Sequence, residues 1–160
     1  MPRSGADLAL LLLGGFRSLV DAAQIELARR GHEDVRPVHD FAIRAIASGA
    51  DSASELGRRM SVSKQAAAKT ISVLQERGYI ARDVDPTDAR RKRLHVTERG
   101  FDMLREAEAI FDDLRDRWGQ QIGENQLKAL EAQLTGLIGT ERVRFDAPGW
   151  IAAQDPADPI

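Results

Sequence analysis

Apolar residues recur every three or four positions along most of this chain, which is the spacing of amphipathic helices. The pattern predicts six helices, over residues 7–30, 38–48, 53–60, 64–77, 98–121 and 124–142. Gly31, Gly49 and Gly78 each follow an apolar run and are typical of a helix C-terminus. The last residues, 143–160, hold three of the six prolines and are expected to form an extended or disordered tail.

Two serines mark the starts of the third and fourth helices. Ser52 stands three residues before Glu55, which is the spacing of a capping box, in which each side chain accepts from a backbone amide of the other. Ser63 follows a tight connection and is predicted to cap the helix that begins at Lys64. A short helix, a tight turn and a longer helix are therefore expected in succession.

A β-hairpin is expected after the fourth helix. The runs Tyr79–Val84 and Arg93–Thr97 read as short strands, and the Pro- and Asp-bearing segment 86–90 reads as the turn between them. This places Arg90 and Arg91 at the turn. Thr97 is predicted to cap the long helix that follows.

Composition narrows the class of protein. With 42% hydrophobic and 30% charged residues the chain is globular, and without cysteine it has no disulfide or thiolate metal site. The run Leu8–Leu13 is too short to span a bilayer and is expected to lie in a helix buried on most sides. We therefore expect a soluble cytoplasmic protein without a membrane partner.

The sequence contains no motif that indicates an enzyme. The sequence contains no nucleophile elbow, Walker sequence or dinucleotide fingerprint. His32, His39 and His95 are scattered, so no metal site and no cofactor are expected. The prediction is a protein that is not an enzyme.

Charge is distributed unevenly along the chain. The net charge is −2, yet residues 58–95 hold ten cations and four anions and are therefore +6. A local basic segment attracts phosphate whatever the overall charge, because electrostatic fields in salt act over short distances.

Helix, turn, helix and basic hairpin in this order predict a mainly α winged helix-turn-helix fold, whose second helix enters the major groove of DNA. Gln is suited to adenine and Lys to guanine or phosphate. Asp88 stands two residues before Arg90 and is expected to orient its guanidinium at the minor groove. Both elements have an alternative interpretation without DNA. The fourth helix would then be an ordinary amphipathic helix with a solvated polar face, and the cations of the turn would only aid solubility. The predicted DNA contacts are Ser52, Ser61, Ser63, Lys64, Gln65, Ala68, Lys69, Arg82, Asp88, Arg90 and Arg91.

Residues 54–100 resemble the MarR family of bacterial transcriptional regulators. The matching positions are Glu55–Leu56–Gly57, Val62–Ser63, Leu74, Gly78, Asp88 with Arg90, and Val96–Thr97 with Gly100. The chain departs from the family pattern at Ala68–Lys69, where Thr-Arg is frequent, and at Val73, where Arg is frequent. These departures bear on base preference.

The resemblance implies one domain over residues 1–142, with dimerisation helices at 7–30 and 98–142 flanking a DNA-binding lobe at 38–97. It implies a homodimeric repressor of a pseudo-palindromic operator on double-stranded DNA, released by a small aromatic or phenolic effector. Residues for such a pocket are Phe16, Arg17, His39, Ile43, Met103 and Leu104, which otherwise belong to the core. Alternatives are a winged-helix protein-interaction module, such as an antirepressor or adaptor, and a ligand-binding protein whose DNA lobe is vestigial.

Overall fold

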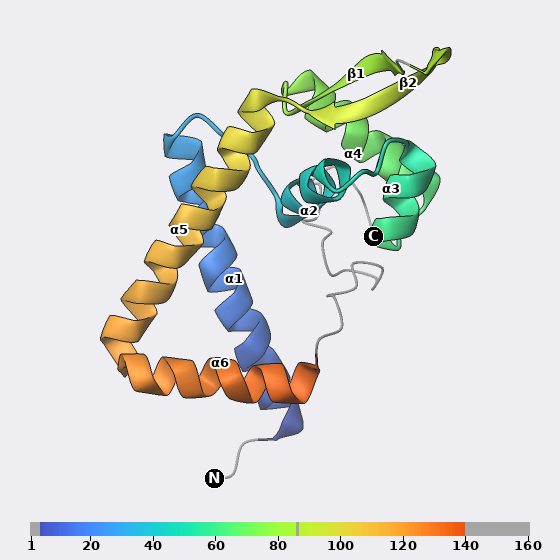
Figure 1. Ribbon diagram of the computed structural model, residues 1–160. Coiled ribbons are helices and arrows are strands. Elements are labelled where there is room, and N and C mark those ends of the chain that lie inside the picture. Colours follow the sequence, from blue (N-terminus) through green and yellow to red (C-terminus); the bar gives the residue numbers. More distant parts are fainter. Residues whose placement is uncertain (1–3, 86, 140–160) are drawn as a thin grey trace, which may run out of the picture. The chain divides into compact units, whose positions relative to one another are not determined.

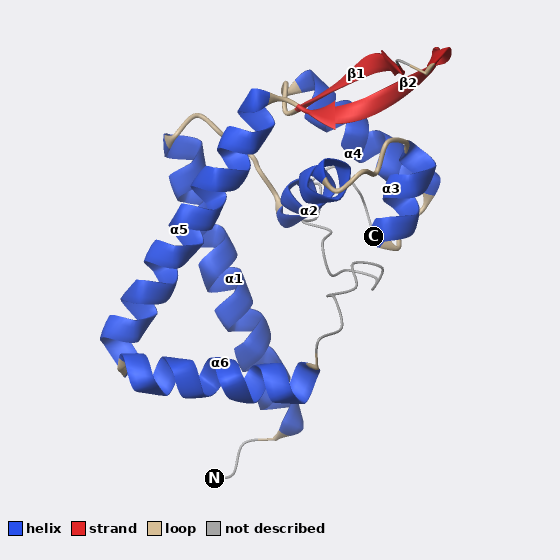
Figure 2. Cartoon of the chain, in the orientation of Figure 1, coloured by secondary structure: helices blue, strands red, loops and turns tan. Residues whose placement is uncertain are grey.

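The computed structural model describes residues 4–85 and 87–139, except the side chains of residues 85 and 88–91. In this part the chain forms helices and one antiparallel hairpin, as the periodicity predicts (Figures 1 and 2). The elements are α1 (Gly5–Arg29), α2 (Pro37–Ala47), α3 (Ala53–Met60), α4 (Lys64–Glu76), β1 (Ile80–Asp85), β2 (Asp88–Val96), α5 (Glu98–Ile122) and α6 (Glu124–Ile138). The predicted mainly α winged-helix class is confirmed. The predicted tail 143–160, with Trp150, lies outside the described residues.

The chain divides into two compact units. One holds residues 4–35 and 105–139 of the described part, and the other holds residues 36–104. The second unit contains the predicted DNA-binding lobe 38–97.

The unit of residues 36–104 has a core drawn from every element in it. Helices α2, α3 and α4 pack on one another, α4 contacts β1, and α2 contacts β2 (Figure 1). Its largest fully buried side chains are Tyr79, Ile43, Leu56, Ile71, Leu74, Ile80 and Met103. This core holds α4 and the hairpin against the same small scaffold.

The hairpin differs from its prediction at the turn. Strand β2 begins at Asp88, five residues before the predicted Arg93, so that only residues 86 and 87 lie between the strands. The register shifts between Val84 and Asp85, whose partners are Lys92 and Asp88. Arg90 and Arg91 therefore lie within the strand at the register shift. The early part of β2 was not predicted because the four cations of residues 90–93 show no alternation of apolar and polar residues. The strand forms there through backbone hydrogen bonds, which leave no mark in the sequence.

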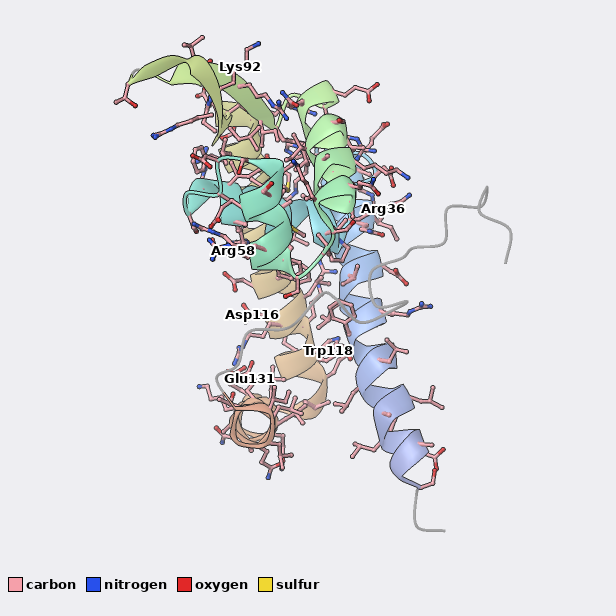
Figure 3. All side chains as sticks on the ribbon, turned by 90° about the vertical axis from the view of Figure 1, so that its right-hand side faces the viewer. Arg36, Arg58, Lys92, Asp116, Trp118 and Glu131 are labelled. Carbon is pink, nitrogen blue, oxygen red and sulfur yellow. The ribbon has the colours of Figure 1, made fainter. Side chains whose placement is uncertain are left out.

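The other unit is built from α1, α5 and α6. Ala23 and Leu27 of α1, with Ala107 and Ile110 of α5, are buried in it. Gly15 lies 3.5 Å, measured from its ideal Cβ position, from the Trp118 ring, and Figure 3 shows Trp118 on the side of α5 that faces α1. The guanidinium of Arg115 binds the carboxylates of Glu131 at 2.8 Å and Glu124 at 3.1 Å, which joins α5 to α6.

Helix α1 is more exposed than predicted. Leu10 is 65% exposed, and Leu8, Leu11, Leu12 and Leu13 are also exposed, so a helix buried on most sides is wrong for a single chain. At 25 residues, α1 extends well beyond the apolar run and is long and apolar enough to cross a membrane. A core helix of a soluble protein and a signal sequence meet the same criteria of length and composition.

Candidate nucleic-acid interface

The turn between α3 and α4 is fixed by local backbone contacts. Helix α3 ends at Met60, and its C-cap, Ser61, has the left-handed conformation (φ 54°, ψ 41°). The Val62 amide donates to the Gly57 carbonyl at 2.9 Å. A Cβ on Gly57 would lie 2.9 Å from the Val62 carbonyl oxygen, so only glycine allows this close approach. The Ser63 hydroxyl then accepts from the Ala66 amide at 3.0 Å, which confirms the predicted cap of α4.

The predicted capping box of α3 is only half formed. The Ser52 hydroxyl accepts from the Glu55 amide at 3.3 Å, as expected. The Glu55 carboxylate turns instead to the guanidinium groups of Arg58 and Arg59. Hydrogen bonding from Arg58 above all, then from Arg59, lowers the pKa of Glu55 below its ordinary value. Two charged partners thus outcompete one backbone amide for this carboxylate.

Arg59 joins α3 to the end of α2. Its guanidinium donates to the Ser48 carbonyl at 2.9 Å and to the Ala45 carbonyl at 3.4 Å, in addition to Glu55. These carbonyls lie at the C-terminal end of α2, where helix carbonyls lack intrahelical partners. Arg59, one of the ten cations of the basic segment 58–95, therefore has a structural role within this unit.

Arg59→Ala is expected to lower the free energy of unfolding by about 1 kcal/mol, because the carbonyls of Ala45 and Ser48 and the carboxylate of Glu55 each lose one hydrogen-bond donor. Arg58→Ala is the matched control, because Arg58 shares Glu55 but its side chain is 76% exposed and forms no hydrogen bond to the described residues of α2. Urea unfolding of both variants checks this. Equal effects of the two substitutions would contradict the structural role of Arg59.

Helix α4 separates an apolar face from a polar one. Ala67, Ile71 and Leu74 are buried against the unit core. Lys64, Gln65, Lys69 and Ser72 are exposed, and Ala68 is half-buried. The predicted faces of this helix are thus confirmed.

Three of these exposed side chains have no partner within the described residues. Lys64, Gln65 and Lys69 make no hydrogen bond or ion pair there. The cations Arg58 and Arg59 on α3, by contrast, are held by Glu55. The positive charge of α4 is therefore available to an external anion.

The predicted serine contacts lie at the start of α3 (Ser52) and next to the start of α4 (Ser61 and Ser63). Ser61 and Ser63 are exposed, and Ser52 is half-buried. The oxygens of Ser52 and Ser63 each accept a backbone amide, which leaves the hydroxyl protons free to donate to a phosphate. Their contact with DNA stays a prediction.

The hairpin carries further exposed cations. Arg82 on β1 is exposed, and Lys92 on β2, which the sequence interpretation did not assign to the site, projects from the hairpin (Figure 3). The side chains of Asp88, Arg90 and Arg91 lie outside the described residues, so the predicted Asp88–Arg90 pair stays a prediction.

Asp51, in the α2–α3 loop, holds β2 in place. Its carbonyl accepts from the Leu94 amide at 3.2 Å, and its carboxylate lies 3.8 Å from the Arg93 guanidinium. This contact was also missed, because residues more than forty positions apart show no common pattern in one sequence. A second contact joins the two strands of the hairpin, because the His95 ring on β2 lies 3.3 Å from the Asp83 carboxylate on β1.

The start of α5 anchors the other end of the hairpin. The Thr97 hydroxyl donates to the Gly78 carbonyl at 2.6 Å and accepts from the Gly100 amide at 3.1 Å, which confirms the predicted cap. The Arg99 guanidinium lies 5.1 Å from the centre of the Tyr79 ring. Burial raises the pKa of Tyr79 above its ordinary value.

The six predicted effector residues fall in both units. Phe16 and Arg17 are exposed on α1, whereas Ile43, Met103 and Leu104 are buried in the unit of residues 36–104. His39 is also buried there, and its Nδ1 accepts from the Arg36 amide at 3.1 Å. The effector pocket stays a prediction.

A cavity of about 250 Å³ lies elsewhere, between α1 and α5. None of the six predicted residues lines it. Its lining residues are Ala22, Ile25, Glu26, Arg29, Arg30, Ile110, Asp113, Leu114 and Arg117. Within the described residues no group of three His, Cys, Asp or Glu side chains is placed to hold a metal ion.

The tight α3–α4 turn, the exposed cations of α4 and the anchored hairpin define a winged helix-turn-helix unit. A family model for the MarR family matches residues 41–91, which confirms the resemblance over this segment. No curated protein matches the chain.

Solved structures of the same fold include FabT from Streptococcus pneumoniae in complex with DNA, at TM-score 0.66 and 18% identity over 84% of this chain and 95% of that one. YusO from Bacillus subtilis aligns at TM-score 0.65 and 20% identity over 87% and 100% of the two chains. CouR from Rhodococcus jostii, bound to p-coumaroyl-CoA, aligns at TM-score 0.57 and 21% identity over 86% and 96%.

Proposed function

We propose that this protein is a MarR-family transcriptional regulator that binds double-stranded DNA sequence-specifically as a homodimer, and that it is not an enzyme. The observation that carries the proposal is the unpartnered set of Lys64, Gln65 and Lys69 on the exposed face of α4. Three long polar side chains without partners in the described residues suit an external surface rich in phosphate and base edges. The DNA complex of FabT, which shares the fold, supports this function.

Each subunit would place α4 in a major groove and the hairpin along the adjacent minor groove. In this arrangement Lys64, Gln65 and Lys69 face the bases and phosphates of the major groove. Arg90 and Arg91, with Arg82 nearby on the hairpin, contact the minor groove and its flanking phosphates. A two-fold dimer then reads half-sites about 34–36 Å apart.

A mobility shift on the DNA upstream of the protein's own gene tests this function. Binding is expected to weaken steeply as salt rises from about 50 to 200 mM, because each phosphate contact releases about 0.9 condensed counterion. A protein-interaction module with the same fold would leave this DNA unshifted at every salt concentration. Binding that does not depend on salt would contradict the proposed interface.

Homodimerisation would cover the exposed apolar side chains of the unit that contains α1 and α6. Leu137 is 84% exposed and Ile138 is 64% exposed at the end of α6, in addition to the leucines of α1. Burial of such side chains stabilises an interface by about 25 cal/mol for each Å² of apolar surface. The same burial would account for a helix as apolar as α1 in a soluble, cytoplasmic protein.

Light scattering of the wild-type protein is expected to give twice the chain mass of 17.6 kDa. Leu137→Glu is expected to shift the protein toward the monomer, because a carboxylate would be buried without a partner. Thr135→Glu, at an exposed polar position on the opposite side of the same helix, is the matched control and should leave the dimer intact. A wild-type monomer at micromolar concentration would contradict the proposed dimer.

Regulation by repression and release is part of the proposal. The CouR structure with its bound thioester supports a small-molecule effector in this fold. An aromatic or phenolic effector would weaken DNA binding only if it bound more tightly to a state of the dimer that does not fit DNA. Titration of a phenolic acid into the protein–DNA complex tests this, with release of the DNA as the expected result.

A further inference from the structure

The exposed side of α4 holds few groups able to form new hydrogen bonds with a base. Gln65, Lys69 and Ser72 stand at helical spacing on this side and are all exposed. The Ser72 hydroxyl donates to the Ala68 carbonyl at 3.1 Å, and the Thr70 hydroxyl donates to the Ala66 carbonyl at 3.1 Å. Both hydroxyl protons are therefore committed to the helix backbone.

Gln65 is thus the uncharged side chain in the first half of α4 that keeps both a donor and an acceptor free within the described residues. Adenine presents an N6 donor beside an N7 acceptor in the major groove, and the two ends of a carboxamide match this pair. Guanine presents two acceptors there, so the carboxamide oxygen of Gln65 would meet an acceptor. The chemistry of Gln65 therefore favours adenine.

Alanine methyl groups flank Gln65. Ala66 is exposed and Ala68 is half-buried on the two sides of the polar face. Along the helix axis Gln65 and Ala68 are separated by about 4.5 Å, since each residue rises 1.5 Å, and base pairs are separated by about 3.4 Å, so the two side chains are within reach of neighbouring pairs. Thymine is the base that presents a methyl group in the major groove, and alanine makes an apolar contact with it.

We infer that each operator half-site contains an A·T pair whose adenine is read by Gln65, next to a pair whose thymine methyl packs against Ala68. Lys64 and Lys69 would neutralise phosphates on either side of these two base pairs. The inference rests on the proposed function, because it names the base pairs that the proposed interface reads.

The test is selection of binding sites from a pool of duplexes randomised over about 20 base pairs, with the full-length protein. We expect the wild type to enrich a motif with one strongly preferred adenine in each half-site. Gln65→Ala is expected to reduce the preference for that adenine by about 10- to 100-fold while the rest of the motif remains. Gln65→Glu is expected to exchange adenine for cytosine, whose N4 group donates to a carboxylate.

Gln120→Ala is the matched control, because Gln120 is an exposed glutamine on α5 and its loss should leave the motif unchanged. Deoxyuridine in place of the neighbouring thymine removes only the methyl group and is expected to weaken wild-type binding about fourfold. A motif that stays the same in both Gln65 variants, or a deoxyuridine duplex bound as tightly as the thymine duplex, would overturn the inference. A pool from which the wild type enriches nothing would overturn the proposed function itself.

Discussion

Replacing Lys64 and Lys69 together with alanine is expected to weaken binding to duplex DNA on the order of 50-fold at 0.1 M salt. Both side chains are exposed on α4 and have no partner in the described residues, so neither cation is neutralised by the protein. If each neutralises one phosphate, each contributes a factor of about 8 at this salt concentration, and the slope of log K against log salt becomes less negative by about 2. Fluorescence anisotropy with a labelled duplex measures both quantities.

The control for this double variant is Arg29→Ala with Lys128→Ala, which removes the same charge from the unit that does not contain α4. Arg29 pairs with Glu26 at 3.4 Å, and Lys128 pairs with Glu124 at 3.5 Å. This control is expected to keep nearly wild-type affinity, because the charges removed lie outside the interface and are screened by salt. An equal loss in both double variants would mean that net charge, rather than α4, determines binding.

Gly100→Ala is expected to lower the free energy of unfolding by about 3 kcal/mol. Gly100 lies in the first turn of α5, and a Cβ there would overlap the Tyr79 carbonyl oxygen and lie 2.6 Å from Val96 Cγ1. The same carbonyl accepts from the Thr97 amide at 3.0 Å, so it cannot move away without losing a hydrogen bond. The new methyl group must therefore displace α5 from the base of the hairpin.

Gly136→Ala is the matched control within α6, because a Cβ at Gly136 meets no atom within 4 Å. It is expected to raise the free energy of unfolding by about 0.5–1 kcal/mol, since alanine restricts the unfolded chain and favours the helix. Urea unfolding at one fixed protein concentration measures both variants, because the stability of a dimer depends on concentration. A Gly100→Ala protein as stable as the wild type would contradict the close packing of α5 on Tyr79.

The helices were predictable because their signals are local. Apolar periodicity placed α4, and the hydroxyl of Ser63 and the glycine at Gly78 marked its two ends within one residue. The exposed face of that helix followed from the same periodicity, so Lys64, Gln65 and Lys69 were placed correctly on it.

The remaining features depend on contacts between distant residues. Arg59 is one of several cations in the sequence, and only folding brings it to the carbonyls of Ala45 and Ser48. The close approaches at Gly57 and Gly100 likewise need a second segment of backbone that no local pattern reveals. Only one of the two hydrogen bonds of the predicted capping box at Ser52 forms. The Glu55 carboxylate binds Arg58 and Arg59, one turn away, because charged donors form stronger hydrogen bonds than a backbone amide.

The exposed leucines of α1 have a related explanation. Hydrophobicity predicts burial, but it does not say whether the covering atoms come from the same chain. In the single chain Leu10 is 65% exposed, so the described residues leave its side chain uncovered. The proposed homodimer provides this cover.

In the proposed function, α4 and the hairpin bind DNA with sequence specificity. The most direct measurement is the ratio of affinities for a duplex selected by the protein and for a shuffled duplex of the same composition, at one salt concentration. We predict that the selected duplex binds at least about 10³-fold more tightly, which is the lower range for specific regulators. Equal affinities for the two duplexes would contradict sequence-specific binding by α4 and the hairpin.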